Sequence, residues 1–259
     1  MPRAVVTGAG RGLGEAIVAQ LRAAGYEVTA TDVNGADHYL DVRDPQACRE
    51  LARAVQPDVW VNNAGVLGAG DAATQGDDVI ESVVSVNLLG VMHGTRAAVE
   101  VMRERDGGRG GGHVINIGSL ASWVPVPGEC VYAATKAGVL SFTLGLEGEL
   151  RAQGVTGVRL SVVCPDGMLT PMITDIIDDP AVAMTFTGLR PTTVDKVAEA
   201  VVAVVRRPRR VVSVPHWRGA QVRIIGAIPD VVLRAAPLFT RLGRAQQDRV
   251  RRALGSAPR

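Results

Sequence analysis

The sequence predicts an α/β protein in which a parallel sheet is covered by helices on both faces. Apolar runs bounded by turn residues alternate with stretches of helical periodicity, which is the pattern of repeated βαβ units. The apolar runs are nearly continuous in valine and isoleucine, as in strands that are buried on both faces. A glycine cluster at residues 8–14 lies between the first apolar run and the first helical stretch. We therefore predict a doubly wound, Rossmann-like single domain.

The individual elements follow from the same patterns. Strands are predicted at Ala4–Thr7, Glu27–Thr31, Val59–Asn62, His113–Ile117, Arg159–Val163 and Arg210–Val214. Long helical patterns occur at Leu13–Ala24, Asp77–Arg105, Val131–Gln153 and Val194–Arg206. Only eight residues separate Asp32, at the end of the second strand, from Asp41, which follows a short third strand. That interval is too short for an ordinary crossover helix, so we expect the second crossover to be a loop.

Composition narrows the class of protein. The chain has 259 residues, 47% of them hydrophobic, which is enough for one large core. Its three cysteines, Cys48, Cys130 and Cys164, have unrelated spacings, and its four histidines show no ligand spacing. We therefore expect reduced thiols and no metal site. Without a signal-peptide pattern or a membrane-spanning stretch, we expect a soluble, cytoplasmic protein that does not bind nucleic acid.

Charge is unevenly distributed along the chain. The segment from Arg206 to Arg259 carries 13 arginines and two acids, so it is +11 while the rest is −9. We divide the chain into a dinucleotide-binding and catalytic part at 1–214, with a substrate lid at about 166–192, and a basic extension at 215–259. The part of the extension at Val222–Leu242 mixes arginines with apolar residues, and Pro229 and Pro237 are expected to break it into short helices. It is expected to pack over the pocket or a neighbouring subunit, or to contact an anionic membrane surface peripherally.

The glycine cluster predicts a dinucleotide cradle. Glycines permit a sharp turn and a close approach of the backbone to a pyrophosphate, and the helix N-terminus supplies amide donors. The spacing is G-x-x-x-G-x-G, and the position between strand and helix favours a cofactor site. The candidate cofactor-binding residues of this loop are Thr7, Gly8, Gly10, Arg11, Gly12, Leu13 and Gly14.

An acidic residue at the end of the second strand favours NAD over NADP. The carboxylate of Asp32 is placed to accept hydrogen bonds from the adenosine ribose and would repel a 2′-phosphate. Arg11 has the opposite effect, because a basic side chain in the glycine loop can neutralise a 2′-phosphate. Val33, directly after Asp32, adds no further positive charge.

A phenol and an ammonium lie four residues apart, at Tyr132 and Lys136, on one face of a predicted helix. The chain contains only three tyrosines and two lysines, so chance explains this pair poorly. A tyrosine that acts as an acid or base near neutral pH needs its pKa lowered from about 10. The nearby Lys136 ammonium and a cationic nicotinamide ring would both lower it.

With the glycine loop and this pair, the sequence resembles the short-chain dehydrogenase/reductase family over about Pro2 to Val214. The resemblance implies that Ser119 hydrogen-bonds the substrate oxygen and that Asn87 holds a water in a proton relay. It also implies that the run beginning at Asn62 supports the sheet and the adenine side. Further cofactor contacts implied in this way come from Asp41, Val42, Asn63, Ala64, Gly65, Tyr132, Lys136, Pro165, Gly167 and Thr170.

One departure concerns the loop beside the nicotinamide. The family usually has Pro-Gly after the sixth strand, whereas this chain has Pro165, Asp166 and Gly167 before Thr170. A changed backbone path or an additional negative charge is therefore expected at Asp166.

The resemblance implies an oxidoreductase that moves hydride between NAD(H) and a secondary alcohol or ketone. Tyr132 would be the acid/base, and Lys136 would hold the ribose and lower the pKa of Tyr132. Two alternatives stay open: an NADPH-dependent carbonyl reductase and a non-catalytic NAD-binding sensor.

The substrate is expected to be lipophilic, because the segments around the catalytic residues are apolar. These apolar residues are Trp123, Val124, Val126, Met168, Leu169, Met172, Ile173, Ile176, Ile177, Met184 and Phe186. The helices at Asp77–Arg105 and Val131–Gln153 carry more apolar positions than one sheet face needs, and in the family the matching helices form a dimer interface. We therefore expect a homo-oligomer, a tetramer or a dimer.

Overall fold

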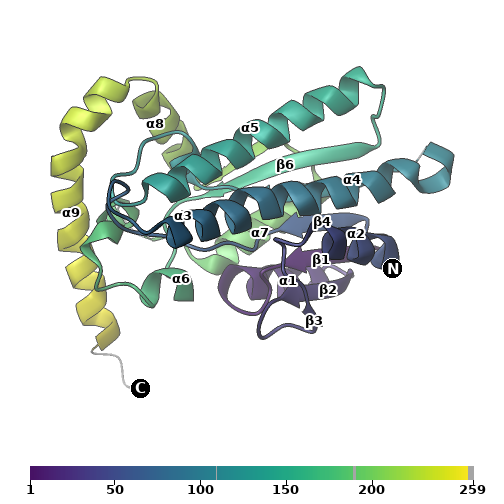
Figure 1. Ribbon diagram of the computed structural model, residues 1–259, viewed down its shortest axis with the longest axis horizontal. Helices are drawn as coiled ribbons and strands as arrows, with labels where there is room; N and C mark the ends of the chain where they lie inside the picture. Colours follow the sequence, from purple (N-terminus) through teal and green to yellow (C-terminus); the bar gives the residue numbers. More distant parts are fainter. Residues whose placement is uncertain (109, 189–190, 256–259) are drawn as a thin grey trace.

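Parallel strands form one sheet in the order β3-β2-β1-β4-β5-β6-β7 in the computed structural model. Figure 1 shows the chain with most of its elements labelled. The structure describes residues 1–108, 110–188 and 191–255. The predicted fold class is confirmed, and each predicted strand overlaps an observed one. The strands are β1 (Arg3–Thr7), β2 (Glu27–Asp32), β3 (His38–Tyr39), β4 (Val59–Asn62), β5 (Gly112–Ile117), β6 (Val158–Pro165) and β7 (Val211–Val214).

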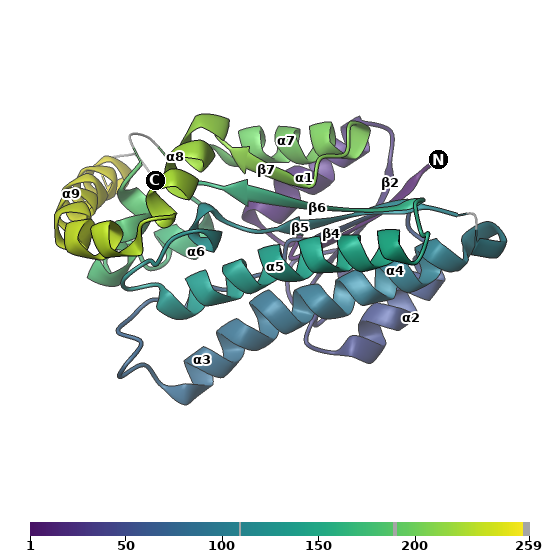
Figure 2. The same cartoon turned by 90° about the horizontal axis from the view of Figure 1, so that it is seen from above.

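Helices cover both faces of this sheet (Figure 2). One face is covered by α1 (Gly12–Ala23) and α7 (Val194–Arg206). The other is covered by α2 (Pro45–Val55), α4 (Gly90–Gly108) and α5 (Cys130–Ala152). The strands are apolar on both sides because each side packs against a helix layer. Trp60, fully buried in β4, is among the largest side chains of the second layer.

The second crossover is a loop, as predicted. Residues 33–37 connect β2 to β3 without a helix. The short β3 pairs only with the last two residues of β2, Thr31 with His38 and Asp32 with Tyr39. Because β3 pairs only with the end of β2, the chain does not run back along the length of β2, and the connection needs no crossover helix.

The helix predicted at Asp77–Arg105 is interrupted, which corrects the sequence prediction. It consists of α3 (Asp77–Val84), a π-helical turn (Ser85–Leu89) and α4. Asn87, at the centre of the turn, is fully buried. π-helical turns are rare and often mark functional positions.

The C-terminal part packs against the lid. The lid contains α6 (Pro171–Thr174) and a 3-10 turn (Pro180–Phe186), and the extension contains α8 (His216–Gly226) and α9 (Pro229–Gly255). Gln247 Nε2 of α9 donates hydrogen bonds to the carbonyl oxygens of Ile177 and Asp179, at 2.7 and 2.8 Å. Residues 189–190 of the predicted lid and 256–259 of the predicted extension lie outside the described residues.

The expectation that Pro237 breaks the extension is wrong, because α9 continues through it. Proline removes one backbone hydrogen bond and crowds the preceding turn. The face of α9 that packs on the lid, with Val232, Ala236 and Gly243 buried, outweighs this cost. Among the described residues, no helix is long and apolar enough to cross a membrane.

Candidate functional site

Two cavities meet at the carboxyl ends of the strands. A cleft of about 750 Å³ lies over the ends of β1, β2 and β4, and a cavity of about 170 Å³ lies over the ends of β5 and β6. Met168, Thr170 and Met172 of the lid line both. Since β1 and β4 are adjacent while β2 lies on the other side of β1, the cleft is at the point where the strand order reverses. Ligands of open α/β sheets bind at this point.

The turn after β1 is packed tightly against neighbouring segments. Gly8 has a φ of +64°, and a Cβ there would lie 2.5 Å from the Cα of Ala64. A Cβ on Gly14 would overlap the Gly8 carbonyl oxygen. The hydroxyl of Thr7 accepts hydrogen bonds from the backbone N–H groups of Asn63 and Ala64, both at 3.1 Å. Thr7 and Gly14 therefore shape the loop from outside the cleft lining.

The N-terminus of α1 faces the cleft without a side-chain cap. Arg11, at the cap position, makes no capping hydrogen bond, and Gly12, with a φ of +63°, adds no side chain. Free N–H groups and the helix dipole together make an anion site. This uncapped end is what a dinucleotide pyrophosphate requires, so the residues present fit the predicted cofactor. The loop residues that line the cleft are Gly8, Gly10, Arg11, Gly12 and Leu13.

The two charged residues that bear on NAD or NADP preference lie on different parts of this cleft. The Asp32 carboxylate accepts the N–H groups of Gly10 at 3.0 Å and Asn34 at 3.2 Å, and it lines the cleft. Arg11 Nη1 lies 2.9 Å from Asp175 Oδ2 of the lid. The charge of Arg11 is therefore paired with the lid rather than with Asp32.

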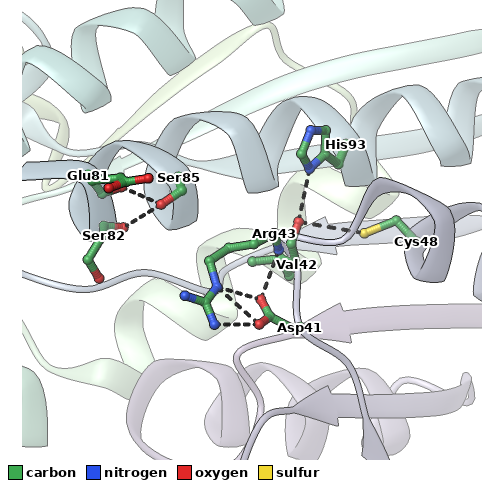
Figure 3. Close-up of polar contacts among 8 residues, drawn as sticks. All are labelled: Asp41, Val42, Arg43, Cys48, Glu81, Ser82, Ser85 and His93. Carbon is green, nitrogen blue, oxygen red and sulfur yellow. Dashed lines mark hydrogen bonds and ion pairs between the residues drawn. The ribbon is translucent and has the colours of Figure 1, made fainter. Parts of the chain in front are cut away.

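Figure 3 shows the polar contacts around Asp41, Val42 and Arg43, in the segment that follows β3. The guanidinium of Arg43 binds both carboxylate oxygens of Asp41 at 2.6–3.0 Å, and this contact lowers the pKa of Asp41. The Val42 carbonyl oxygen accepts hydrogen bonds from His93 Nδ1, at 3.1 Å, and Cys48 Sγ, at 3.9 Å. Asp41, Val42 and Arg43 all line the cleft. Arg43 was missed in the sequence, where no spacing distinguishes it from other surface arginines.

The turn after β4 completes the cleft wall with Asn63, Ala64 and Gly65. The Asn63 side-chain amide donates hydrogen bonds to the carbonyl oxygens of Thr7 and Gly8, at 3.1 and 2.9 Å. It thereby joins the ends of β1 and β4. Behind it, Asn62 belongs to a buried hydrogen-bond network with Asn116 of β5, at 2.8 Å. Asn63 thus ties the end of β4 to β1, and Asn62 ties it to β5, beside the cleft.

Ser119, Tyr132 and Lys136 are brought together on the wall of the smaller cavity. Ser119 follows β5, and Tyr132 and Lys136 lie in the first two turns of α5. The Ser119 side chain lies near enough to the Tyr132 phenol to lower its pKa, and its hydroxyl oxygen accepts the Ala121 N–H at 3.1 Å. Lys136 Nζ lies 5.5 Å from the centre of the Tyr132 ring and donates to the Ile117 carbonyl oxygen at 3.0 Å. Pro165 and Gly167, predicted as cofactor contacts, also line this cavity, and Thr170 lines both cavities.

The balance of effects on the Tyr132 phenol differs from the sequence prediction. Burial, together with the charge of Glu129, raises the pKa of Tyr132 above its ordinary value, against the lowering effect of the nearby Ser119 side chain. Burial also lowers the pKa of Lys136, to about 8. The protein's own groups therefore keep the phenol protonated at neutral pH, and the expected lowering by Lys136 is not what dominates.

Asn87 lies behind Lys136 rather than on the cavity wall. Its side-chain oxygen accepts the Val66 N–H and its side-chain nitrogen donates to the Val66 carbonyl oxygen, both at 2.8 Å. A Cβ on Gly65 would contact both Asn87 Oδ1, at 3.3 Å, and Lys136 Nζ, at 3.8 Å. Asn87 thus fixes the turn after β4 against α5, and its role in a proton relay stays a prediction.

Arg218 and Glu129 line the smaller cavity but were not predicted from the sequence. Asp166 forms an ion pair with Arg218 of α8, at 3.3 Å, so the additional negative charge at this position is paired. Glu129, just before α5, is buried beside Thr185. Arg218 lies 52 residues from Asp166 in sequence, and nothing in the spacing of either residue indicates the contact.

The apolar wall of the smaller cavity is partly as predicted. Val124, Val126, Met168, Met172, Ile173 and Met184 line it, together with Val222 of α8. Other residues of the predicted set serve elsewhere. Phe186 packs in a cluster with Ile173 and Val182, Leu169 is exposed, and the Trp123 ring stacks under Arg223 at 4.3 Å.

Comparison with known proteins identifies the family. A family model described as short chain dehydrogenase matches residues 2–181. The 3-oxoacyl-[acyl-carrier-protein] reductase FabG of Salmonella typhimurium is 32% identical over 195 residues, covering 68% of this chain and 77% of FabG. The acetoacetyl-CoA reductase of Shinella zoogloeoides is 33% identical over 188 residues, covering 66% of this chain and 75% of that protein.

A longer relative and two solved structures are also similar to this chain. The probable oxidoreductase EphD of Mycobacterium tuberculosis is 28% identical over 90% of this chain, which spans only 44% of EphD's length. The fold is similar to a short-chain dehydrogenase/reductase from Burkholderia phymatum in complex with NAD, with a TM-score of 0.75, 23% identity, and coverage of 86% of this chain and 92% of that one. It is also similar to a short chain dehydrogenase from Burkholderia cenocepacia in complex with NADP, with a TM-score of 0.68, 24% identity, and coverage of 82% and 87%. This chain is a member of the short-chain dehydrogenase/reductase family.

Proposed function

We propose that this enzyme transfers hydride between NAD(H) and a secondary alcohol or ketone of lipophilic character. The observation that carries this proposal is the meeting of Ser119, Tyr132 and Lys136 on the wall of an apolar cavity that adjoins the dinucleotide cleft. FabG and the acetoacetyl-CoA reductase, both reductases by name, are consistent with this chemistry.

The residues divide the work of the reaction among them. The glycine loop and Asp32 hold the dinucleotide in the cleft, and its nicotinamide supplies or accepts the hydride when bound. Ser119 and Tyr132 hydrogen-bond the substrate oxygen. In ketone reduction the protonated Tyr132 phenol gives its proton to that oxygen, and in alcohol oxidation it takes the proton back. Lys136 holds the ribose and compensates the charge of the phenolate, while Asn87 positions the turn beside it.

A substrate panel tests this proposal. Reaction of the enzyme with NAD⁺ or NADP⁺ and secondary alcohols from short to long-chain, followed by nicotinamide absorbance, should give a kcat/KM that rises with apolar size. The physical reason is that each buried methylene contributes about 0.8 kcal/mol to binding. A flat dependence on size contradicts the lipophilic substrate. Failure to turn over any alcohol or ketone with either cofactor favours the non-catalytic sensor.

NAD is the proposed cofactor, because Asp32 lines the cleft and Arg11 is paired with Asp175. The NADPH-dependent alternative rests on Arg11 and Arg43, which line the same cleft but are each paired with a carboxylate, that of Asp175 and that of Asp41. In the wild type we expect a lower Kd for NAD⁺ than for NADP⁺. Asp32→Ala should reduce the ratio of the two Kd values by roughly tenfold, equivalent to about 1.4 kcal/mol, because the 2′-phosphate is no longer repelled.

Isothermal titration with both cofactors measures this ratio. The matched control is Asp37→Ala, because Asp37 lies in the same loop but pairs with Arg22 at the surface and does not line the cleft. The control should keep the wild-type ratio. Tighter binding of NADP⁺ by the wild type would show that Arg11 or Arg43 outweighs Asp32.

A homo-oligomer, most simply a tetramer, is proposed through α4 and α5. Leu89 and Leu144 are exposed large apolar residues just before α4 and on α5. Gly145 and Gly148 on α5 have open space where a Cβ would be, so another helix can approach closely there. Light scattering at micromolar concentration should give a mass of two or four chains. A monomer would contradict the proposal.

The helix α9 of the C-terminal extension has two faces that bear on the possible partners of this protein. The inner face of α9 packs on the lid, as expected for a segment that lies over the pocket. Its outer face exposes Val231, Leu238 and Leu242 beside arginines. A neighbouring subunit and an anionic membrane surface both remain open as partners of this outer face.

A further inference from the structure

The smaller cavity contains a buried carboxyl group that the proposed reaction does not use. Glu129 is 4% exposed and lines the cavity together with Tyr132. The backbone at the preceding residue, Gly128, determines where Glu129 lies. Gly128 has a φ of +87°, and a Cβ there would overlap the carbonyl of Ala181 in the lid. The chain therefore turns tightly against the lid and directs the next residue into the interior.

Only half of this carboxyl group has a protein partner. The hydroxyl of Thr185 donates to Glu129 Oε1 at 2.6 Å, and Thr185 lines the cavity as well. Among the described residues, Oε2 has no hydrogen-bond partner. Oε2 is not among the fully buried polar atoms that lack a partner, so it is accessible from the cavity that Glu129 lines. A carboxyl group on the wall of a largely apolar cavity, with one oxygen left to pair there, points to a polar group of a ligand.

The cations of the cavity do not neutralise Glu129. Lys136 donates to the Ile117 carbonyl oxygen, and Arg218 of α8 is paired with Asp166. Burial accordingly raises the pKa of Glu129 to about 7, against the lowering effect of the Thr185 hydrogen bond. Near neutral pH the group is present in both its charged and its neutral form.

The choice of ligand chemistry follows from these two forms. A hydroxyl group donates to a carboxylate and accepts from a carboxylic acid, so it pairs with Glu129 in either form. A carbonyl group would pair only with the neutral form. A cationic group would pair only with the charged form, and it would be repelled by Lys136.

The distance from the reacting carbon is also limited. Glu129, at the N-cap of α5, and Tyr132, in its first turn, line the same cavity, and the charge of Glu129 acts on the Tyr132 phenol, so the two groups lie near each other. We propose that Glu129 and Thr185 form a hydroxyl-binding subsite, and that preferred substrates carry a second hydroxyl one or two carbons from the reacting carbon. This inference rests on the proposed function and narrows its substrate class to diols and hydroxyketones with an apolar remainder.

The test compares 2,3-octanediol with 2-octanol as substrates of the full-length enzyme with NAD⁺. We expect the wild type to prefer the diol in kcat/KM by at least about tenfold. Glu129→Leu should abolish this preference, so that the two kcat/KM values become about equal. Glu129→Gln should keep part of the preference, because an amide still donates and accepts hydrogen bonds. Thr185→Val, a smaller change, should weaken the preference partially. Glu199→Leu, at an exposed position on α7, is the matched control and should keep the wild-type ratio.

Binding of NADH, measured by its fluorescence, checks that each variant is folded. A wild type that shows no diol preference overturns the subsite, as does a folded Glu129→Leu variant with an unchanged ratio. If Glu129→Leu does not fold, Thr185→Val decides on the same criterion. If the wild type turns over neither substrate with either cofactor, the proposed function itself is overturned. This outcome distinguishes failure of the proposed function from failure of the subsite.

Discussion

Tyr132→Phe should lower kcat by roughly 10²–10⁴-fold while leaving the Kd for NAD(H) nearly unchanged. The substitution removes one oxygen, the atom that exchanges a proton with the substrate, and keeps the ring that packs at the start of α5. Ser119 remains to bind the substrate oxygen, but its hydroxyl is a poor proton donor at neutral pH. Stopped-flow or steady-state absorbance measures kcat, and NADH fluorescence titration measures the Kd.

The matched control for this variant is Tyr39→Phe. Tyr39 is largely exposed on β3 and lines neither cavity, so the loss of its hydroxyl should change kcat little. If Tyr132→Phe retained more than a few per cent of wild-type kcat, another group would have to be the proton donor.

Lys136→Ala should impair both cofactor binding and turnover, with a loss in kcat/KM of roughly 10²–10³-fold. The ammonium group is buried beside Tyr132 and is anchored to β5 through the Ile117 carbonyl oxygen. Its removal takes away the positive charge that stabilises a phenolate, and it removes the group assigned to the ribose. Unlike Tyr132→Phe, this variant should therefore bind NAD(H) more weakly.

The only other lysine in the chain gives a direct comparison. Lys196 is exposed in the first turn of α7, and Lys196→Ala should leave both kcat/KM and the Kd for NAD(H) near their wild-type values. An unchanged Kd for NAD(H) in Lys136→Ala would contradict the assignment of Lys136 to the ribose. An unchanged kcat would contradict its proposed effect on Tyr132.

The sheet was predictable from sequence because its strands are buried on both faces. Continuous valine and isoleucine runs identify such strands, and the short interval after Asp32 correctly predicted a loop in place of a helix. The helix α2 was missed, although Asp44 followed by Pro45 is a helix-start signal and Asp44 does cap the helix. The π-helical turn at Ser85–Leu89 left no trace in the hydrophobic periodicity, which continues through it.

The catalytic candidates were found from local patterns, whereas the remaining cavity walls depend on contacts between distant segments. Tyr132 and Lys136 are recognisable because a helix places residues four apart on one face. The contact of Glu129 with Thr185 spans 56 residues, and that of Asp166 with Arg218 spans 52. Neither pair has a fixed spacing, so only the folded chain shows that both enclose the same cavity.

The two adjoining cavities have a consequence for how this enzyme can diversify. The cofactor cleft is built mainly from turns within the first 65 residues, while the smaller cavity, apart from Leu67, is enclosed by residues 117–222. Selection on the second set can exchange one substrate for another while the glycine loop is inherited unchanged. Met168, Thr170 and Met172 line both cavities, so substitutions at these three positions would also alter cofactor binding. Mutational libraries confined to the cavity walls outside these three residues should therefore yield new specificities on an intact dinucleotide site.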